Sequence, residues 1–339
     1  MPAPLSFSVL LPTFIQAGAP KRVDQLRSAL SSIVDQQISV PYEIIIIDDN
    51  SPVPISELLA DAPLGVEADI RCVRQPRGNG LVQALNRGLS EAKYDLIARL
   101  DDDDIWLPGK MSHQLDRFEN DPDLTILGTG MTLVFESGDA PVDHIRPDGW
   151  SPILNFFCQV GCPFPHGSIL AKKNIFNLLG RYPQTAAVRH CEDYALWSIW
   201  IRFFKPGMVE QSFYNYTVSE RSISSVHASR SREISQRICG TFTDLKINDI
   251  IPRAMDDLAA SLDITRLQAG VVAFRMWHYG CSATLPRSAL SPLRALMPDR
   301  TIFFEDPSDR SIALNDLLAG FGSAPLESAG GDPVTISCR

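Results

Sequence analysis

The chain has 339 residues, of which 45% are hydrophobic and 21% are charged, and this composition excludes a disordered chain, a collagen and a coiled coil. The formal net charge at pH 7 is −9, and the lysines and arginines form no blocks, so we expect no nucleic-acid partner. The length suits two ordinary domains, or one large domain with an appendage.

Strands and helices are predicted to alternate in the first hundred residues. Four apolar or β-branched runs end at turn formers and predict strands, at 6–11, 42–47, 69–74 and 94–100. Apolar residues at helical spacing predict helices between them, one set being Val23, Leu26, Leu30 and Ile33 and the other Leu81, Leu85 and Leu89. This order predicts a mainly parallel sheet with helices on both faces, whose ligands bind beyond the carboxyl ends of the strands.

The pattern is more mixed after residue 120. An apolar stretch covers 124–135, a strand is predicted at 166–170, and helices are predicted at 172–179 and 191–204. Near residue 235 the pattern changes again, with helical candidates at 233–262 and 264–279 and an end rich in Gly, Ser and Pro from about residue 320. We therefore expect a mostly helical C-terminal extension.

The seven cysteines show neither a disulfide framework nor the paired spacing of a zinc site. Cys158 and Cys162 lack a nearby His or Cys pair at zinc spacing, so buried thiols are the simpler interpretation. The N-terminal apolar run has no basic segment and is too short for a signal sequence or a membrane span. These features predict a cytoplasmic protein without a transmembrane segment.

Two carboxylates, Asp48 and Asp49, end the second predicted strand in IIIIDDNSP. Asp, Asn, Ser and Pro are common turn formers, so a turn signal is one interpretation. The other interpretation is functional, because a carboxylate at this strand end could accept the imide N–H of a pyrimidine. Both interpretations stay open at this point.

The acidic run Asp101-Asp102-Asp103-Asp104 ends the fourth predicted strand and is followed by Ile105 and Trp106. Four adjacent carboxylates repel one another, and a bound cation would relieve that repulsion. Oxygen ligands suit Mg²⁺ or Mn²⁺ and leave room for substrate phosphates. A solvated charge run is the alternative, which the apolar strand before it and the Trp after it disfavour.

A third acidic element, Glu192 and Asp193, opens an apolar helix. Acidic residues at a helix start are often partners of the helix dipole only. If one of them reaches the crevice at the strand ends, it is a base of the kind that takes a proton from an attacking hydroxyl.

Together these segments resemble the family 2 glycosyltransferases, an inverting group with the A-type glycosyltransferase fold. The resemblance covers about two thirds of the chain in matching order and spacing. It rests on LLPTF at 10–14, EIIIIDDNSP at 43–52, GNGLVQALNRGL at 78–89, RLDDDDIWLPGK at 99–110, FPHGSIL at 164–170, GRYPQTAAVRHCEDYALW at 180–197 and YNYTVSERSIS at 214–224. It implies a catalytic domain at 1–235, with a nucleotide-binding half at 1–110 and an acceptor-binding half at 111–235, and an accessory region at 236–339.

The resemblance also implies roles for individual residues. Asp193 would be the general base and Asp103 the main metal ligand, with Asp101 and Asp103 as the two acids of the Asp-any-Asp motif. Donor contacts would come from Pro12, Thr13 and Phe14 as the floor for the base, Asp48 or Asp49 on the base edge or ribose, Arg77, and Asp101 or Asp102 near the ribose. The acceptor would contact His166, Glu192 and Trp197.

Two positions depart from the family pattern. Asp102 stands where the family often has a small residue between the two acids. The segment 214–224 has Tyr214-Asn215 where the family often has a Tyr-Arg pair, which leaves a phosphate role for Arg221 or His227 open.

The implied activity is metal-dependent transfer of a sugar, with inversion, from a nucleoside diphosphate sugar to a hydroxyl of a carbohydrate or glycolipid. A UDP-sugar is the favoured donor, Mn²⁺ or Mg²⁺ the cofactor, and polysaccharide or other glycoconjugate synthesis the setting. Peripheral association with the inner face of a membrane and a homo-oligomer stay open. The alternatives are an inactive nucleotide-sugar-binding protein and a sugar nucleotidyltransferase, although residues 10–22 lack the Gly-rich basic loop of the latter.

Overall fold

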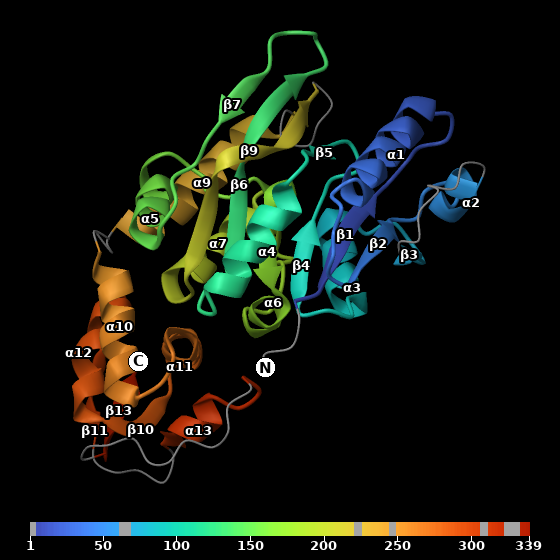
Figure 1. Ribbon diagram of the computed structural model, residues 1–339. Helices are drawn as coiled ribbons and strands as arrows, with labels where there is room; N and C mark the ends of the chain where they lie inside the picture. Colours follow the sequence, from blue (N-terminus) through green and yellow to red (C-terminus); the bar gives the residue numbers. More distant parts are fainter. Residues whose placement is uncertain (1–4, 61–68, 220–225, 244–248, 306–310, 322–332) are drawn as a thin grey trace.

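The fold is described by a computed structural model for residues 5–60, 69–219, 226–243, 249–305, 311–321 and 333–339. The first hundred residues form β1 (Phe7–Thr13), α1 (Pro20–Val34), β2 (Tyr42–Asp48), α2 (Ile55–Ala60), β3 (Asp69–Arg74), α3 (Leu81–Glu91) and β4 (Leu96–Arg99). β1 pairs in parallel with both β2 and β4, and β2 pairs in parallel with β3. The predicted parallel sheet is confirmed for this half of the molecule (Figure 1).

The isoleucine run of β2 is buried on both sides of this sheet. Successive residues of a strand point to opposite faces, so Ile45 and Ile47 join the core cluster that contains α3, whereas Ile44 and Ile46 join the cluster that contains α1. The helix α3 approaches closely because it carries Gly88, where a Cβ would lie 2.9 Å from Ile47 Cδ1. The two helices thus fix β2 from both faces and hold its polar carboxyl end in place.

Beyond β4 the same sheet continues with mixed strand directions. The order is β4, β8 (Leu170–Lys172), β6 (Ile126–Phe135), β9 (Pro206–Val218) and β5 (Ile105–Trp106), and β7 (Val142–His144) pairs with β6. β6 and β9 run parallel, while β8 is antiparallel to both of its neighbours. The helices of this half are α4 (Lys110–Asn120), α5 (Trp150–Gln159), α6 (Lys173–Leu178) and α7 (Glu192–Phe203), and η2 (Ala186–Val188) is a 3₁₀ turn.

The strand predicted at 166–170 is wrong in all but its last residue. The chain forms the 3₁₀ turn η1 (His166–Ser168), and the strand starts at Leu170. The turn is fixed by Ser168 Oγ, which donates to the carbonyl of Pro165 at 2.8 Å. A side chain at Gly167 would overlap the ring and hydroxyl of Tyr214, so a tertiary contact, which a local pattern does not contain, sets this turn.

The C-terminal extension is mostly helical, as predicted, and also contains a sheet that the sequence pattern did not predict. Its helices are α9 (Ala228–Thr243), α10 (Ile250–Leu262), α11 (Arg266–Tyr279), the 3₁₀ turn η3 (Arg287–Ala289), α12 (Leu290–Leu296) and α13 (Leu314–Leu317). Four strands, β10 (Ser282–Pro286), β11 (Ile302–Glu305), β12 (Ile312–Ala313) and β13 (Pro333–Cys338), form the sheet in the order β11-β13-β10-β12. In Figure 1 the elements from α10 onward lie below the large sheet, whereas α9 lies beside it, near α5.

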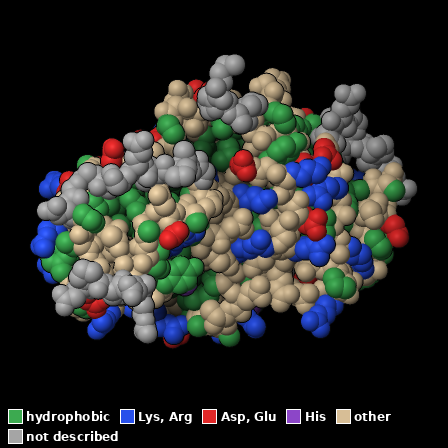
Figure 2. Space-filling view, turned by 90° about the horizontal axis from the view of Figure 1, so that it is seen from below, with side chains coloured by type: hydrophobic (Ala, Val, Ile, Leu, Met, Phe, Trp, Pro, Cys, Tyr) green, Lys and Arg blue, Asp and Glu red, His purple; other side chains and the backbone are tan. Residues whose placement is uncertain are grey.

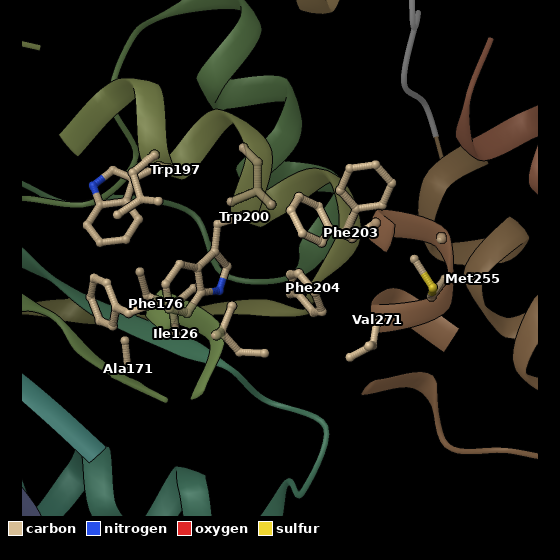
Figure 3. Close-up of a cluster of buried hydrophobic side chains, with 14 of the residues drawn as sticks. Ile126, Ala171, Phe176, Trp197, Trp200, Phe203, Phe204, Met255 and Val271 are labelled. Atoms are coloured by element: carbon tan, nitrogen blue, oxygen red, sulfur yellow. The ribbon is translucent and has the colours of Figure 1, made fainter. Parts of the chain in front are cut away.

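The extension shares a hydrophobic core with the first 235 residues. Figure 3 shows Phe203, the last residue of α7, and the following Phe204 on the side of Met255 of α10 and Val271 of α11, and Trp200 of α7 belongs to the same core cluster. All five side chains are at most 1% exposed. The boundary near residue 235 is therefore a change in sequence pattern across which one core runs without interruption.

A substitution at the contact between α7 and α11 tests this shared core. A Cβ at Gly270 of α11 would clash with the backbone carbonyl of Phe203, so Gly270→Ala forces the two helices apart. We expect a loss of about 1–3 kcal/mol in the free energy of unfolding, measured by urea denaturation. The matched control is Gly240→Ala in α9, where nothing lies within 4 Å of the new Cβ. The control should stabilise slightly, by up to about 1 kcal/mol, and equal stabilities for both variants would contradict the shared core.

Charged side chains of both signs are interleaved on the face of the molecule that Figure 2 presents. Elsewhere in the fold, Arg71 pairs with Glu43 and Glu91, and Lys93 pairs with Asp69. Among the helices that the structure describes, none is both long enough and apolar enough to cross a bilayer.

Candidate active site

The end of β1 presents one exposed aromatic ring. Pro12 and Thr13 are buried, whereas Phe14 is 47% exposed. The next residue, Ile15, is buried again, and its N–H donates to Ser51 Oγ at 3.1 Å. Of the three residues that the resemblance placed under the base, Phe14 is therefore the one with a free surface.

Asp48 and Asp49 have different surroundings at the end of β2. Asp48 is 1% exposed and accepts hydrogen bonds from the N–H groups of Ser51 at 2.7 Å and Ile55 at 3.3 Å, and from Arg74 Nη1 at 2.5 Å. These contacts fix the turn after β2, which is the structural interpretation of the motif. The carboxylate of Asp49 is half-buried and is the more accessible of the two.

Asp49 holds the loop that follows β3. Its Oδ1 accepts from Gln75 Nε2 at 2.6 Å and from the N–H of Asn79 at 2.9 Å, and its Oδ2 accepts from the N–H of Gly80 at 2.8 Å. Arg77 lies exposed on this loop. The contact brings two of the predicted donor residues, Asp49 and Arg77, to the same edge of the sheet.

The acidic run after β4 divides into carboxylates with separate partners. Asp101 forms a two-pronged ion pair with Arg99, which is 3% exposed. Asp104 is 1% exposed and accepts from the hydroxyl of Tyr214 and, at 2.7 Å, from the N–H of Thr217. Asp104 therefore joins the acidic run to β9.

Asp102 and Asp103 share the guanidinium of Arg22. Asp102 Oδ2 accepts from the Thr13 hydroxyl at 2.5 Å, and its Oδ1 contacts Arg22 Nη2 at 2.5 Å. Asp103 Oδ2 contacts Arg22 Nη1 at 3.0 Å, and 32% of its side chain is exposed, against 9% for Asp102. Burial and the neighbouring charge of Asp101 raise the pKa of Asp103. Asp103 is thus the carboxylate of the run with the most accessible oxygens.

The start of α7 carries the third acidic element. Asp193 keeps 26% of its side chain exposed, and its Oδ1 accepts from the N–H of Tyr194 at 2.8 Å. Burial and the nearby charge of Glu192 raise the pKa of Asp193 to about 6. Glu192 is only 7% exposed, and its Oε2 has no hydrogen-bond partner among the residues that the structure describes.

His166 lies next to Asp193, with 4.0 Å between its Nδ1 and Asp193 Oδ2. Its Nε2 is 2.7 Å from the hydroxyl of Tyr182. Burial and the charge of Arg99 hold the pKa of His166 well below its usual range, so the imidazole is neutral at physiological pH. The neutral ring is held between the Tyr182 hydroxyl and the Asp193 carboxylate.

Trp197 does not face this site. Its side chain is fully buried and packs edge-on against Phe164, Phe176 and Trp200. The prediction that it contacts the acceptor is corrected here, because an indole without exposed surface packs beneath His166 and Tyr182.

The acidic run and the start of α7 meet at the same place in the fold. Asp193 is close enough to Asp101 for its charge to raise the pKa of that carboxyl, and both feel the guanidinium of Arg99. Within the described ranges, no group of three or more His, Cys, Asp or Glu side chains converges on a metal position. Among these carboxylates, Asp103 is the one whose exposed side chain could hold a metal ion.

Three residues of this arrangement were not found by the sequence analysis: Arg22, Arg99 and Tyr182. A signal existed for Arg99, which directly precedes the acidic run. None existed for Arg22, because its partner Asp102 is 80 positions away in the chain. Arg221 lies outside the described residues, and His227 stacks on His190 with 3.9 Å between ring centroids.

Comparison with known proteins finds similar glycosyltransferases. A relative, EpsE of Bacillus subtilis, is 29% identical over 195 residues, which are 58% of this chain and 66% of EpsE. The amylovoran biosynthesis glycosyltransferase AmsE of Erwinia amylovora is 26% identical over 193 residues, or 56% of this chain and 68% of AmsE. The chain thus spans about two thirds of the length of these relatives.

A structural likeness exists to TarS residues 1–349 of S. aureus, solved in complex with UDP. The TM-score is 0.49 with 14% identity over 87% of this chain and 88% of that chain, which is too low for a conclusion. The family comparison is decisive. The family model described as "Glycosyl transferase family 2" matches residues 8–177, from β1 through the acidic run to α6. The chain therefore belongs to the family 2 glycosyltransferases.

Proposed function

We propose that the chain transfers a sugar, with inversion and with help from Mn²⁺ or Mg²⁺, from a nucleoside diphosphate sugar to an acceptor hydroxyl. The observation that carries the proposal is that Asp193 lies close enough to Asp101 for their charges to interact, while Asp103 of the same acidic run keeps the accessible carboxylate. The acidic run suits the diphosphate of a donor, and Asp193 suits the hydroxyl of an acceptor. The relative AmsE is named for amylovoran biosynthesis, which supports a carbohydrate or glycolipid acceptor in polysaccharide synthesis.

The donor half of the site is built from β1, β2 and the loop after β3. The exposed ring of Phe14 offers a face on which a base can stack. Asp49 follows β2, the strand that pairs with β1. Among the described residues its Oδ2 accepts only from the N–H of Gly80, and this oxygen suits the imide N–H of uracil, which favours a UDP-sugar. Arg77 is exposed on the loop that Asp49 holds, where it can reach a phosphate.

The metal fits Asp103, the most exposed carboxylate of the run, whereas Asp101 and Asp104 have their oxygens occupied by protein donors. A divalent cation held there would offset the charge that develops on the departing diphosphate.

Asp193 supplies the proton chemistry on the acceptor side. Its carboxylate removes the proton of the acceptor hydroxyl as that oxygen forms its bond to the anomeric carbon. The bond from this carbon to the donor oxygen breaks at the same time, and its electron pair leaves with the diphosphate. A single displacement of this kind inverts the anomeric configuration.

A thermal-shift panel with UDP, GDP, dTDP and CDP, each with and without Mn²⁺, tests the proposal. A ligand that binds the native state raises the melting temperature. At a ligand concentration of 100 times its Kd, the free energy of unfolding increases by about 2.7 kcal/mol. We expect the largest shift with UDP, and we expect Mn²⁺ to increase that shift. The absence of any nucleotide-dependent shift would contradict the proposed donor.

Turnover separates the two alternative functions. An inactive binding protein would show the nucleotide shift without hydrolysing or transferring the sugar of a donor. A sugar nucleotidyltransferase would release pyrophosphate from a nucleoside triphosphate and a sugar phosphate, which we expect this chain not to do, because residues 10–22 lack a Gly-rich phosphate loop.

A further inference from the structure

Arg22 lies at the carboxylates that the donor complex needs. It is the third residue of α1, which starts at Pro20. Its two terminal nitrogens contact two different side chains, with Nη2 2.5 Å from Asp102 Oδ1 and Nη1 3.0 Å from Asp103 Oδ2. Nη1 also donates to Gln25 Oε1 at 3.2 Å, one turn along the helix.

The acidic run has two arginine partners of different kinds. Arg99 is 3% exposed and is fixed in the core by its ion pair with Asp101. Separating the two would leave a buried charge without its partner, which is costly. The side chain of Arg22 is 31% exposed, and it stands on a long flexible stem. Arg22 can therefore move away from the acidic run where Arg99 cannot.

The two contacts of Arg22 also differ in what would remain after such a movement. Asp102 would keep the hydroxyl of Thr13, which donates at 2.5 Å. Asp103 would keep no charged partner among the interactions of the described residues. A divalent cation bound to Asp103 would repel the guanidinium, because two cations on one carboxylate would lie only a few ångströms apart.

We propose that Arg22 is the counter-cation of Asp103 in the donor-free protein, and that a divalent cation must displace Arg22 from Asp103 to bind. This inference rests on the proposed function in one respect, the assignment of Asp103 as the metal ligand. The exchange makes the metal affinity of the free protein low. Arg22 acts through Asp103 and is a positioning residue.

The test is the affinity of the full-length protein for Mn²⁺ alone, measured from free Mn²⁺ by electron paramagnetic resonance without nucleotide. Arg22→Gln removes the competing cation, so we expect Mn²⁺ to bind about 5-fold more tightly or better. This factor is the change in equilibrium constant that corresponds to the loss of one ion pair. The matched control is Lys21→Gln, which removes one positive charge at the next residue, where Lys21 pairs with Glu136 at 2.8 Å. Its Mn²⁺ affinity should stay within about 2-fold of the parent, as expected for an exposed pair.

Two further variants keep the test decisive. Arg22→Lys retains the charge and protects the fold, but lacks the two forked donors, so its Mn²⁺ affinity should lie between those of the parent and Arg22→Gln. An unchanged or weaker affinity in Arg22→Gln, or an equal gain in Lys21→Gln, would overturn the inference. Asp103→Asn checks the proposed function separately: if its Mn²⁺ affinity equals that of the parent, the metal assignment itself fails.

Discussion

Replacing Asp193 with Asn should lower turnover by about 10²–10⁴-fold, the usual contribution of general base catalysis. Affinity for the donor nucleotide should stay near that of the parent, because the role proposed for Asp193 is on the acceptor hydroxyl. An amide retains an oxygen that can accept from the N–H of Tyr194, so the start of α7 keeps its hydrogen bond. Steady-state kinetics with separate measurement of UDP affinity checks both expectations. Transfer at the parental rate would show that another group is the base.

The pH dependence of the parent enzyme gives a second signature of Asp193. The base works in its ionised form, and its pKa is raised to about 6 by burial and by Glu192. Turnover should therefore be constant well above pH 6 and fall tenfold per pH unit below it. The matched variant Glu192→Gln removes a neighbouring negative charge, which lowers the pKa of Asp193 and should move the acid limb to lower pH. If the acid limb stays at the same pH in Glu192→Gln, the charge of Glu192 does not raise the pKa of the catalytic base.

The stability of Asp193→Asn should change in the opposite direction from its activity. A carboxyl whose pKa is higher in the folded protein destabilises the fold once it ionises. For Asp193 this cost appears as the pH rises from the ordinary pKa of an aspartate, 3.8, to the raised pKa of about 6, and it is fully present above that. Asp193→Asn should therefore be more stable than the parent at pH 8 and lose this advantage at pH 4, as measured by urea unfolding. Lower stability at pH 8 would indicate a structural role.

The parallel half of the fold could be predicted because its signals are local. The isoleucines at 44–47 and the helical spacing of Leu81, Leu85 and Leu89 each lie within one element, and both match the observed β2 and α3. The sheet of the extension has no such signal. Its strand β12 has two residues, and β10 pairs with a strand about fifty positions away, with Ser282 opposite Ser337. Pairing between strands so far apart in the sequence produces no hydrophobic periodicity that either segment would show by itself.

The site could be predicted to the level of motifs, and the roles of single carboxylates depend on their tertiary partners. Asp48 and Asp49 are adjacent in sequence, yet one is buried in a turn and the other holds the Arg77 loop. The same division separates Asp104, which is bonded to Tyr214 and Thr217, from Asp103. The strand-end position of these carboxylates could be predicted from the sequence. Their different roles depend on hydrogen-bond partners that are distant in the sequence.

Asp103→Asn should weaken the binding of UDP in the presence of Mn²⁺ and leave metal-free binding nearly unchanged. The amide keeps the shape of the side chain but loses the charge that attracts the cation. Loss of even an outer-shell partner of a metal costs about 10–100-fold in affinity, so we expect at least about 10-fold here. Calorimetry with and without Mn²⁺ measures the difference directly.

The matched control is Asp116→Asn on α4, which removes the same charge from an exposed position and should change neither affinity. Asp104→Asn offers a contrast within the acidic run, because Asp104 bonds to β9 through Tyr214 and Thr217. Its substitution should leave the effect of Mn²⁺ on UDP binding unchanged. If Asp103→Asn bound UDP as tightly as the parent in the presence of Mn²⁺, Asp103 would not be the metal ligand. Its carboxylate would then serve only as the partner of Arg22.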